Sequence, residues 1–151
     1  MKIPKINVSV SFDKKVKKSE LYRIGSSKDV ADLCKKIFNA DTFDWTEEFI
    51  ILCLNNANKV LGYYKISSGG FNGTVVDPRV VFTVALNSCA SGIIAIHNHP
   101  SGNEFPSSPD RTITHKLKNA GDFLDIKLLD HIILYDDDGF YSFADNGDSP
   151  F

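Results

Sequence analysis

The chain has 151 residues, of which 42% are hydrophobic, so it has the usual size of one globular domain with a sizeable core. Seventeen Lys and Arg residues against nineteen Asp and Glu residues give a formal net charge of −2. This balance excludes the global positive field that drives non-specific binding to nucleic acid. Three cysteines without a C-x-x-C spacing argue against a disulfide framework and a zinc ribbon. No apolar run is long enough to cross a bilayer and no secretion signal is evident, so we expect a soluble, cytoplasmic protein without a membrane partner.

The first half of the chain predicts a strand, a helix and a hairpin. Residues 5–12, KINVSVSF, alternate apolar and polar side chains, which predicts a strand, and a lysine-rich turn follows. Residues 26–40 predict an amphipathic helix, with Ser26 as N-cap and Asp29 completing a capping box. Residues 47–67 predict two strands around a turn at residues 55–58.

A second helix and a buried strand are predicted next. Asp77 is a favourable N-cap and Pro78 suits the first helical position, so a helix should run to about Asn87. Residues 90–99, ASGIIAIHNH, form a short apolar run that predicts a central strand ending in two histidines.

The last part of the chain predicts one more helix and a hairpin. Ser108 is the expected N-cap, Pro109 the first helical residue and Gly121 the end of this helix. Residues 126–144 predict two strands joined by an Asp-Gly turn near residues 138–139. Without repeats or linkers, the chain should form one layered α/β or α+β domain.

Two histidines and an aspartate form the strongest candidate site. In an extended segment, alternation turns His97 and His99 to the same side, as two ligands of one metal require. Asp110 falls in the first turn of the following helix, where the helix dipole favours the ionised carboxylate. Three protein ligands with one open position are typical of catalytic zinc sites, in which zinc lowers the pKa of water to about 7.

A hydrolytic metal site also needs a general base that does not bind the metal. Glu47 and Glu48 stand at the start of the first hairpin strand, and only one of them can face the site because successive strand residues point in opposite directions. An H-x-H pair alone is often coincidental, but the proline-flanked loop, the helix-start aspartate and the distant glutamate strengthen the metal hypothesis.

These residues resemble a known superfamily. The segment HNHPSGNEFPSSPD matches H-x-H-P, six residues, then S-x-x-D, the JAMM pattern of the JAB/MPN metalloproteases. Together with GTVVDPR and LLDHIIL, it resembles the RadC family in particular, over residues 25–147. We therefore expect residues 25–151 to form the RadC-like domain and residues 1–24 to form an N-terminal strand and basic turn of unclear role. Longer RadC proteins carry an N-terminal helix-hairpin-helix module, for which this chain has no room.

The resemblance implies a cytidine-deaminase-like fold, with a mixed, curved sheet and helices packed on its faces. It also implies one Zn²⁺ per chain, bound by His97, His99 and Asp110. Ser107 would steady the oxyanion of the tetrahedral intermediate, a role suited to a preorganised donor. The family's base glutamate precedes the strand as E-x-F, which aligns with Glu47, although a slip by one residue to Glu48 stays open.

Four further positions are weaker candidates for ligand support or substrate contact. Asn98 and Ser101 could orient ligands or bind substrate, but loop building explains them at least as well. Asp130 and His131 resemble the family's DH pair and could support the metal ligands, with a satisfied buried polar pair as the equal alternative.

The leading hypothesis is a zinc-dependent JAMM-type hydrolase in which activated water attacks a peptide or isopeptide bond of a peptide or protein substrate. A second hypothesis is a DNA-associated protein of repair or mobile-element biology, supported by the lysines at 14–18 and opposed by the acidic balance. A third is a metal-stabilised interaction module without turnover. Exposed strand edges could bind a peptide or pair two copies into a homodimer.

Overall fold

The fold is a five-stranded mixed sheet with helices on both faces. The computed structural model describes residues 1–69, 75–136 and 138–151. Its helices are α1 (Ser27–Cys34), α2 (Pro78–Asn87) and α3 (Ser108–Phe123), and its strands are β1 (Glu48–Leu54), β2 (Val60–Ser68), β3 (Gly92–Asn98), β4 (Lys127–Leu134) and β5 (Phe140–Ser142). The strand order is β2-β1-β3-β4-β5, with β3 and β4 parallel and the other neighbours antiparallel. This arrangement confirms the predicted α/β (α+β) fold class. No helix in the described ranges is long and apolar enough to span a membrane.

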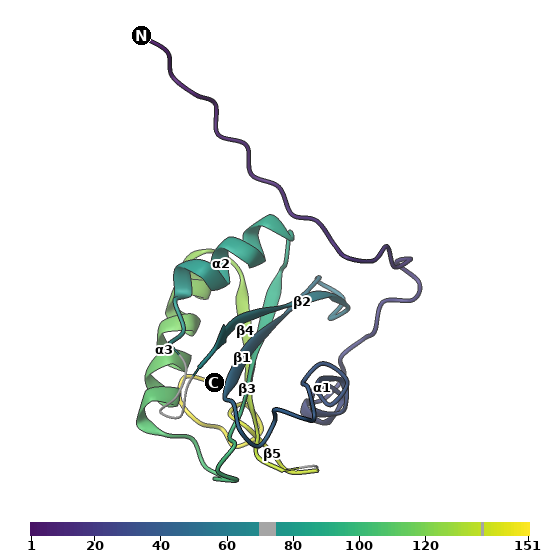
Figure 1. The fold of residues 1–151 in the computed structure, drawn as a ribbon, viewed down its shortest axis with the longest axis vertical. Helices are drawn as coiled ribbons and strands as arrows, with labels where there is room; N and C mark the ends of the chain where they lie inside the picture. Colours follow the sequence, from purple (N-terminus) through teal and green to yellow (C-terminus); the bar gives the residue numbers. More distant parts are fainter. Residues whose placement is uncertain (70–74, 137) are drawn as a thin grey trace.

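Alternation along the central strands divides the core into two layers. Helices α2 and α3 lie against one face of the sheet and α1 against the other (Figure 1). Every residue of β1 and of β3 is buried because both faces are covered. The α1 face takes Ile50, Leu52, Leu54, Ile94 and Ile96, and the α2/α3 face takes Phe49, Ile51, Cys53, Ile93 and Ala95. His97 continues this second series, so the sheet delivers it to the α2/α3 face.

The N-terminal ends of α1 and α2 form as predicted. Ser26 and Asp29 make a complete capping box at the start of α1. Asp77 is the N-cap of α2: its side chain accepts a hydrogen bond from the backbone amide of Arg79, and Pro78 occupies the first helical position. However, α1 ends at Cys34 instead of continuing to residue 40. The amides of residues 37 and 38 both donate to the Cys34 carbonyl, at 2.8 and 2.9 Å, and this tightened turn ends the helix.

The start and end of α3 differ from the prediction. Its N-cap is Ser107 and not Ser108, because a capping box joins residues three apart and only Ser107 has an acid, Asp110, at that distance. Gly121 does not end the helix, which continues to Phe123. A Cβ at Gly121 would clash with the carbonyl oxygen of Ile126, so glycine here permits a close approach of the residue that precedes β4.

Both hairpins are present. The turn at residues 55–58 joins β1 to β2, and Asn58 adopts φ of 55° there. Strands β4 and β5 pair antiparallel as predicted, and the Tyr135 amide donates to the Gly139 carbonyl at 3.2 Å. Residue 137, inside the predicted Asp-Gly turn region, lies outside the described residues.

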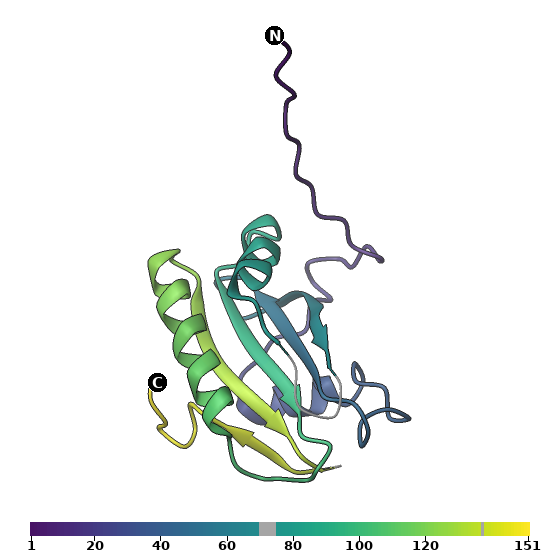
Figure 2. The same cartoon turned by 60° about the vertical axis from the view of Figure 1, so that its left-hand side comes forward.

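The predicted strand at residues 5–12 is wrong. This segment is exposed, and within the described part of the chain no backbone hydrogen bond involves residues 1–16. It extends away from the folded body (Figure 2). Alternation indicates a side-chain pattern suited to a sheet, but a strand also needs backbone pairing with a neighbouring strand, and among the described residues the segment 5–12 makes none.

Candidate metal centre

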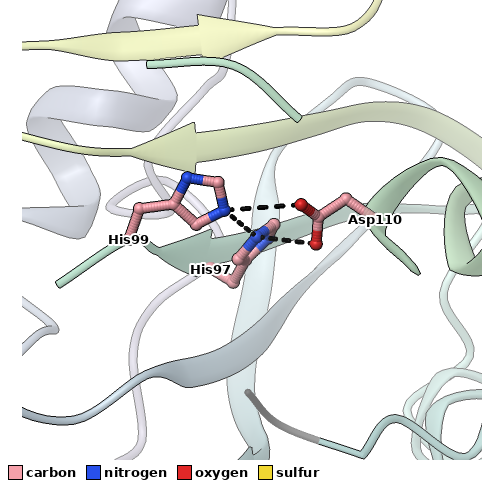
Figure 3. A group of neighbouring side chains, drawn as sticks. All are labelled: His97, His99 and Asp110. Atoms are coloured by element: carbon pink, nitrogen blue, oxygen red, sulfur yellow. Dashed lines mark hydrogen bonds and ion pairs between the residues drawn. The ribbon is translucent and has the colours of Figure 1, made fainter. Parts of the chain in front are cut away.

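His97, His99 and Asp110 converge at the end of β3 and the start of α3. The Nε2 atoms of the two histidines are 3.1 Å apart. Asp110 Oδ1 lies 3.1 Å from His97 Nε2, and Asp110 Oδ2 lies 3.4 Å from His99 Nε2. Figure 3 shows the two imidazoles and the carboxylate directed toward one another. All three residues are buried, and their potential ligand atoms lie within 4.8 Å of one another.

The protonation states around the site follow from burial and neighbouring charges. Burial disfavours ionisation of Asp110, but the two imidazoles and the Ser107 hydroxyl outweigh it and hold the pKa of that carboxyl well below its usual value. Burial alone would lower the pKa of His99, but Asp110, the Asn103 carbonyl and Glu47 together raise it. The site therefore stabilises a positive charge between a carboxylate and two ring nitrogens.

A buried hydrogen-bond chain assigns the tautomer of His97. The Thr114 hydroxyl lies 2.6 Å from the Asp110 carbonyl oxygen, to which it can only donate, so it accepts from His131 Nδ1, also at 2.6 Å. His131 is fully buried, and burial is the main reason that its pKa lies well below the usual value, so it is neutral. Its Nε2 then accepts from His97 Nδ1 at 2.9 Å. In the neutral ring, the lone pair of His97 is then on Nε2, which faces Asp110.

His99 reaches the same state by a different contact. Its Nδ1 donates to the Asn103 carbonyl at 2.7 Å, which in the neutral ring leaves the lone pair on Nε2. When both rings are neutral, two lone pairs face each other beside a carboxylate, an arrangement that favours a cation between them. Two imidazole nitrogens and one carboxylate oxygen are a donor set that Zn²⁺ accepts, so the residues present fit the expected metal.

The Ser107–Asp110 capping box leaves one carboxylate oxygen for ligation. Asp110 Oδ2 accepts from the Ser107 amide at 2.7 Å and from the Ser107 hydroxyl at 2.5 Å. Oδ1 makes no such capping contact and faces His97. The first turn of α3 therefore fixes the direction of the carboxylate before any ion binds.

Replacing Thr114 with Val should weaken metal binding. The change keeps the shape of the side chain but removes the hydroxyl that orients His131 and, through it, His97. Loss of such support typically lowers metal affinity by about 10–100-fold, and we expect this range in a competition titration with a chromogenic zinc chelator. Thr112 is the matched control, because its hydroxyl also donates to the carbonyl four residues earlier, at 2.9 Å, but has no contact with His131. Equal affinity of Thr114→Val and Thr112→Val would contradict the role of Thr114.

The candidate ligands open into a groove of about 890 Å³. Glu47, His99, Ser101, Ser107 and Asp110 line it together with apolar side chains that include Phe49, Val76 and Ile113. Glu48 is placed differently: it is buried and its Oε1 lies 2.6 Å from the Lys65 ammonium. Of the two glutamates considered from the sequence, Glu47 is therefore the one that lines the groove.

Asn98 lies between the two histidines in sequence, but its side chain points to the opposite side of β3. Its Nδ2 donates to the carbonyls of Phe43 and Thr46, at 2.7 and 2.9 Å, and its Oδ1 accepts from the Glu48 amide at 2.8 Å. These bonds hold the backbone on both sides of Glu47. Because all its bonds go to the main chain, Asn98 anchors the chain that presents Glu47.

The remaining sequence candidates divide between site and scaffold. His131 joins the buried chain described above, and its ring stacks on Phe143 with centroids 5.0 Å apart. The Asp130 carboxylate does not join this chain. It accepts hydrogen bonds from the His131 amide, the Ser142 hydroxyl and the Ala144 amide, so it holds the end of β5 against β4. Burial raises the pKa of Asp130 despite these bonds. Sequence reasoning missed Thr114, whose position four residues after Asp110 on one helix face was the available signal.

Comparison with known proteins shows the family of this chain. The family described as RadC-like JAB domain matches residues 24–148. The chain belongs to that family. Among its relatives are the UPF0758 protein of Flavobacterium johnsoniae, 45% identical over 128 residues that cover 85% of this chain and 54% of that protein, and UPF0758 protein BH3032 of Halalkalibacterium halodurans, 38% identical over 120 residues that cover 80% and 51%. The RadC-like chain thus spans about half the length of these relatives.

Proposed function

We propose that this RadC-like domain is a zinc-dependent hydrolase that cleaves an amide bond, peptide or isopeptide, in a peptide or protein substrate. The observation that carries the proposal is the convergence of His97, His99 and Asp110 on one point at the wall of a groove that Glu47 and Ser107 also line. A metal-stabilised scaffold needs no such groove, and it needs no acid beside the ligands.

Each residue of the site has a distinct part in this proposal. His97, His99 and Asp110 would hold the ion, which when bound supplies Lewis acidity toward water and the substrate carbonyl. Glu47 takes a proton from the attacking water and returns it to the leaving nitrogen. Ser107 donates to the developing oxyanion, for which its hydroxyl must turn from Asp110 Oδ2 toward the groove. Phe49, Val76 and Ile113 contact apolar parts of the substrate and exclude water.

The first test is the metal content of the protein purified without added metal. We expect about one zinc per chain by elemental analysis, and its loss in His99→Ala, because two remaining ligands hold zinc poorly. His115→Ala is the matched control, since His115 is exposed on α3 outside the cluster and its removal should leave the metal content unchanged. A wild-type protein that contains no metal and binds none when zinc is supplied would refute the proposal.

A further inference from the structure

The first twelve residues, here called the arm, carry a largely exposed apolar face. Ile6, Val8, Val10 and Phe12 alternate with polar residues, and 85%, 67%, 40% and 55% of their surfaces are exposed. In an extended chain these four side chains share one side. Exposed apolar alternation of this length is the pattern of a strand that pairs with another sheet edge.

The same protein has a long sheet edge that the described chain leaves mostly uncovered. β2 is an outermost strand of nine residues, whereas β5, at the other edge, has three. Among the described residues, the outer side of β2 is paired only at its start, where the Val60 amide donates to Tyr22 and a bridge joins Arg23 to Lys59. Tyr63 and Tyr64 farther along are 56% and 49% exposed. A free edge of this length is a docking site for a strand.

The arm meets its own body only at its base. The Phe12 ring lies against β2, where a Cβ on Gly62 would be 3.3 Å from it. A cavity of about 250 Å³ remains between residues 9–12 and the surface formed by β2 and α2. From there the chain leads away from the body in both views (Figures 1 and 2). The rest of the arm is therefore available to contact another molecule.

Charge favours a second copy of this chain as that molecule. The first 18 residues contain six of the 17 basic residues and one of the 19 acidic residues, a net charge of +5. The remaining chain then has 11 basic and 18 acidic residues, a net charge of −7. The arm itself holds two of these six lysines and no acidic residue, and the other four follow it directly. The positive N-terminal segment of one copy therefore attracts the negative body of another, whereas like-charged parts repel.

We propose that the arm of one copy adds as a strand to the outer edge of β2 in a second copy, and that the exchange is reciprocal. Backbone hydrogen bonds supply the pairing, and Val8 and Val10 pack on the apolar side of the new strand pair. Reciprocal exchange gives a closed, two-fold dimer in which neither long edge is free. The proposal is independent of the hydrolytic activity, since it uses no residue of the groove.

Sedimentation velocity of the full chain tests this pairing. The wild-type protein should sediment as a dimer, with twice the 16.8 kDa mass of one chain. The double variant Val8→Asp/Val10→Asp should raise the dissociation constant of the dimer by at least tenfold. Asn7→Asp/Ser9→Asp is the matched control: it adds the same charge on the opposite side of the arm and should remain dimeric. Hydrogen exchange in residues 61–68 should be slower in the wild type than in the apolar-face variant.

Two results would overturn the inference. A wild-type protein of monomer mass means that the arm finds no second copy, even if its amides are protected, because protection would then come from its own β2. A dimer that survives Val8→Asp/Val10→Asp as well as the control does would use another surface.

Discussion

Replacing Glu47 with Gln should reduce hydrolysis by about 10²–10⁴-fold, the usual contribution of a general base, while leaving fold and metal content unchanged. The amide keeps the size of the side chain and its place in the groove but cannot accept the proton of the attacking water. Since Glu47 is not one of the three clustered ligands, the metal should stay. The measurement is the turnover of peptide and isopeptide substrates, with metal analysis of the same sample.

Glu48→Gln is the control for this experiment. Glu48 is adjacent in sequence but its carboxylate contacts Lys65, so its substitution should change turnover far less than that of Glu47. The reverse ranking would assign the base to Glu48. Full activity in both variants would remove the glutamates from the mechanism.

Replacing Asn98 with Ala should lower both stability and turnover. Asn98 is completely buried, and its substitution leaves three main-chain groups around Glu47 without their partner. An unsatisfied buried polar group costs about 1–3 kcal/mol, so we expect a loss of about 3 kcal/mol or more in the free energy of unfolding by urea denaturation. Under conditions where the variant is folded, kcat should also fall while zinc content is retained, because the segment that carries Glu47 is released.

The control for Asn98 is Asn119→Ala, at an exposed position of α3. A surface change of this kind should stay within about 0.5 kcal/mol of the wild type. If Asn98→Ala were destabilised but kept full turnover, Asn98 would support the fold alone and its role in positioning Glu47 would be refuted.

The local parts of the fold could be predicted from the sequence. Ser26, Asp77 and the continuous apolar run of β3 act within a few residues, so N-caps and apolar runs identify them. The convergence of His97 and His99 also followed from alternation alone. The order of the strands and the division of the core depend on contacts between distant segments, and no local pattern contains them.

The errors have physical causes of the same kind. Ser107 and Ser108 are both good N-caps, and only the partner carboxylate at Asp110 selects the first. Residues 5–12 have the side-chain pattern of a strand but, among the described residues, no backbone pairing with the sheet. The different roles of Glu47 and Glu48 depend on where each residue lies in the fold. Glu48 pairs with Lys65, whereas Glu47 lines the groove.

The pairing of β3 with its neighbours has a consequence for folding. His97 lies opposite Phe49 on β1 and beside Ile133 on β4. A slip of β3 by one residue would turn both histidines into the α1-side core and Ile94 and Ile96 out of it. An ion that binds only the correctly paired chain would stabilise that state by about 2.7 kcal/mol at a hundredfold excess over its dissociation constant. The ligand cluster would thus select the strand register, independently of any reaction it supports.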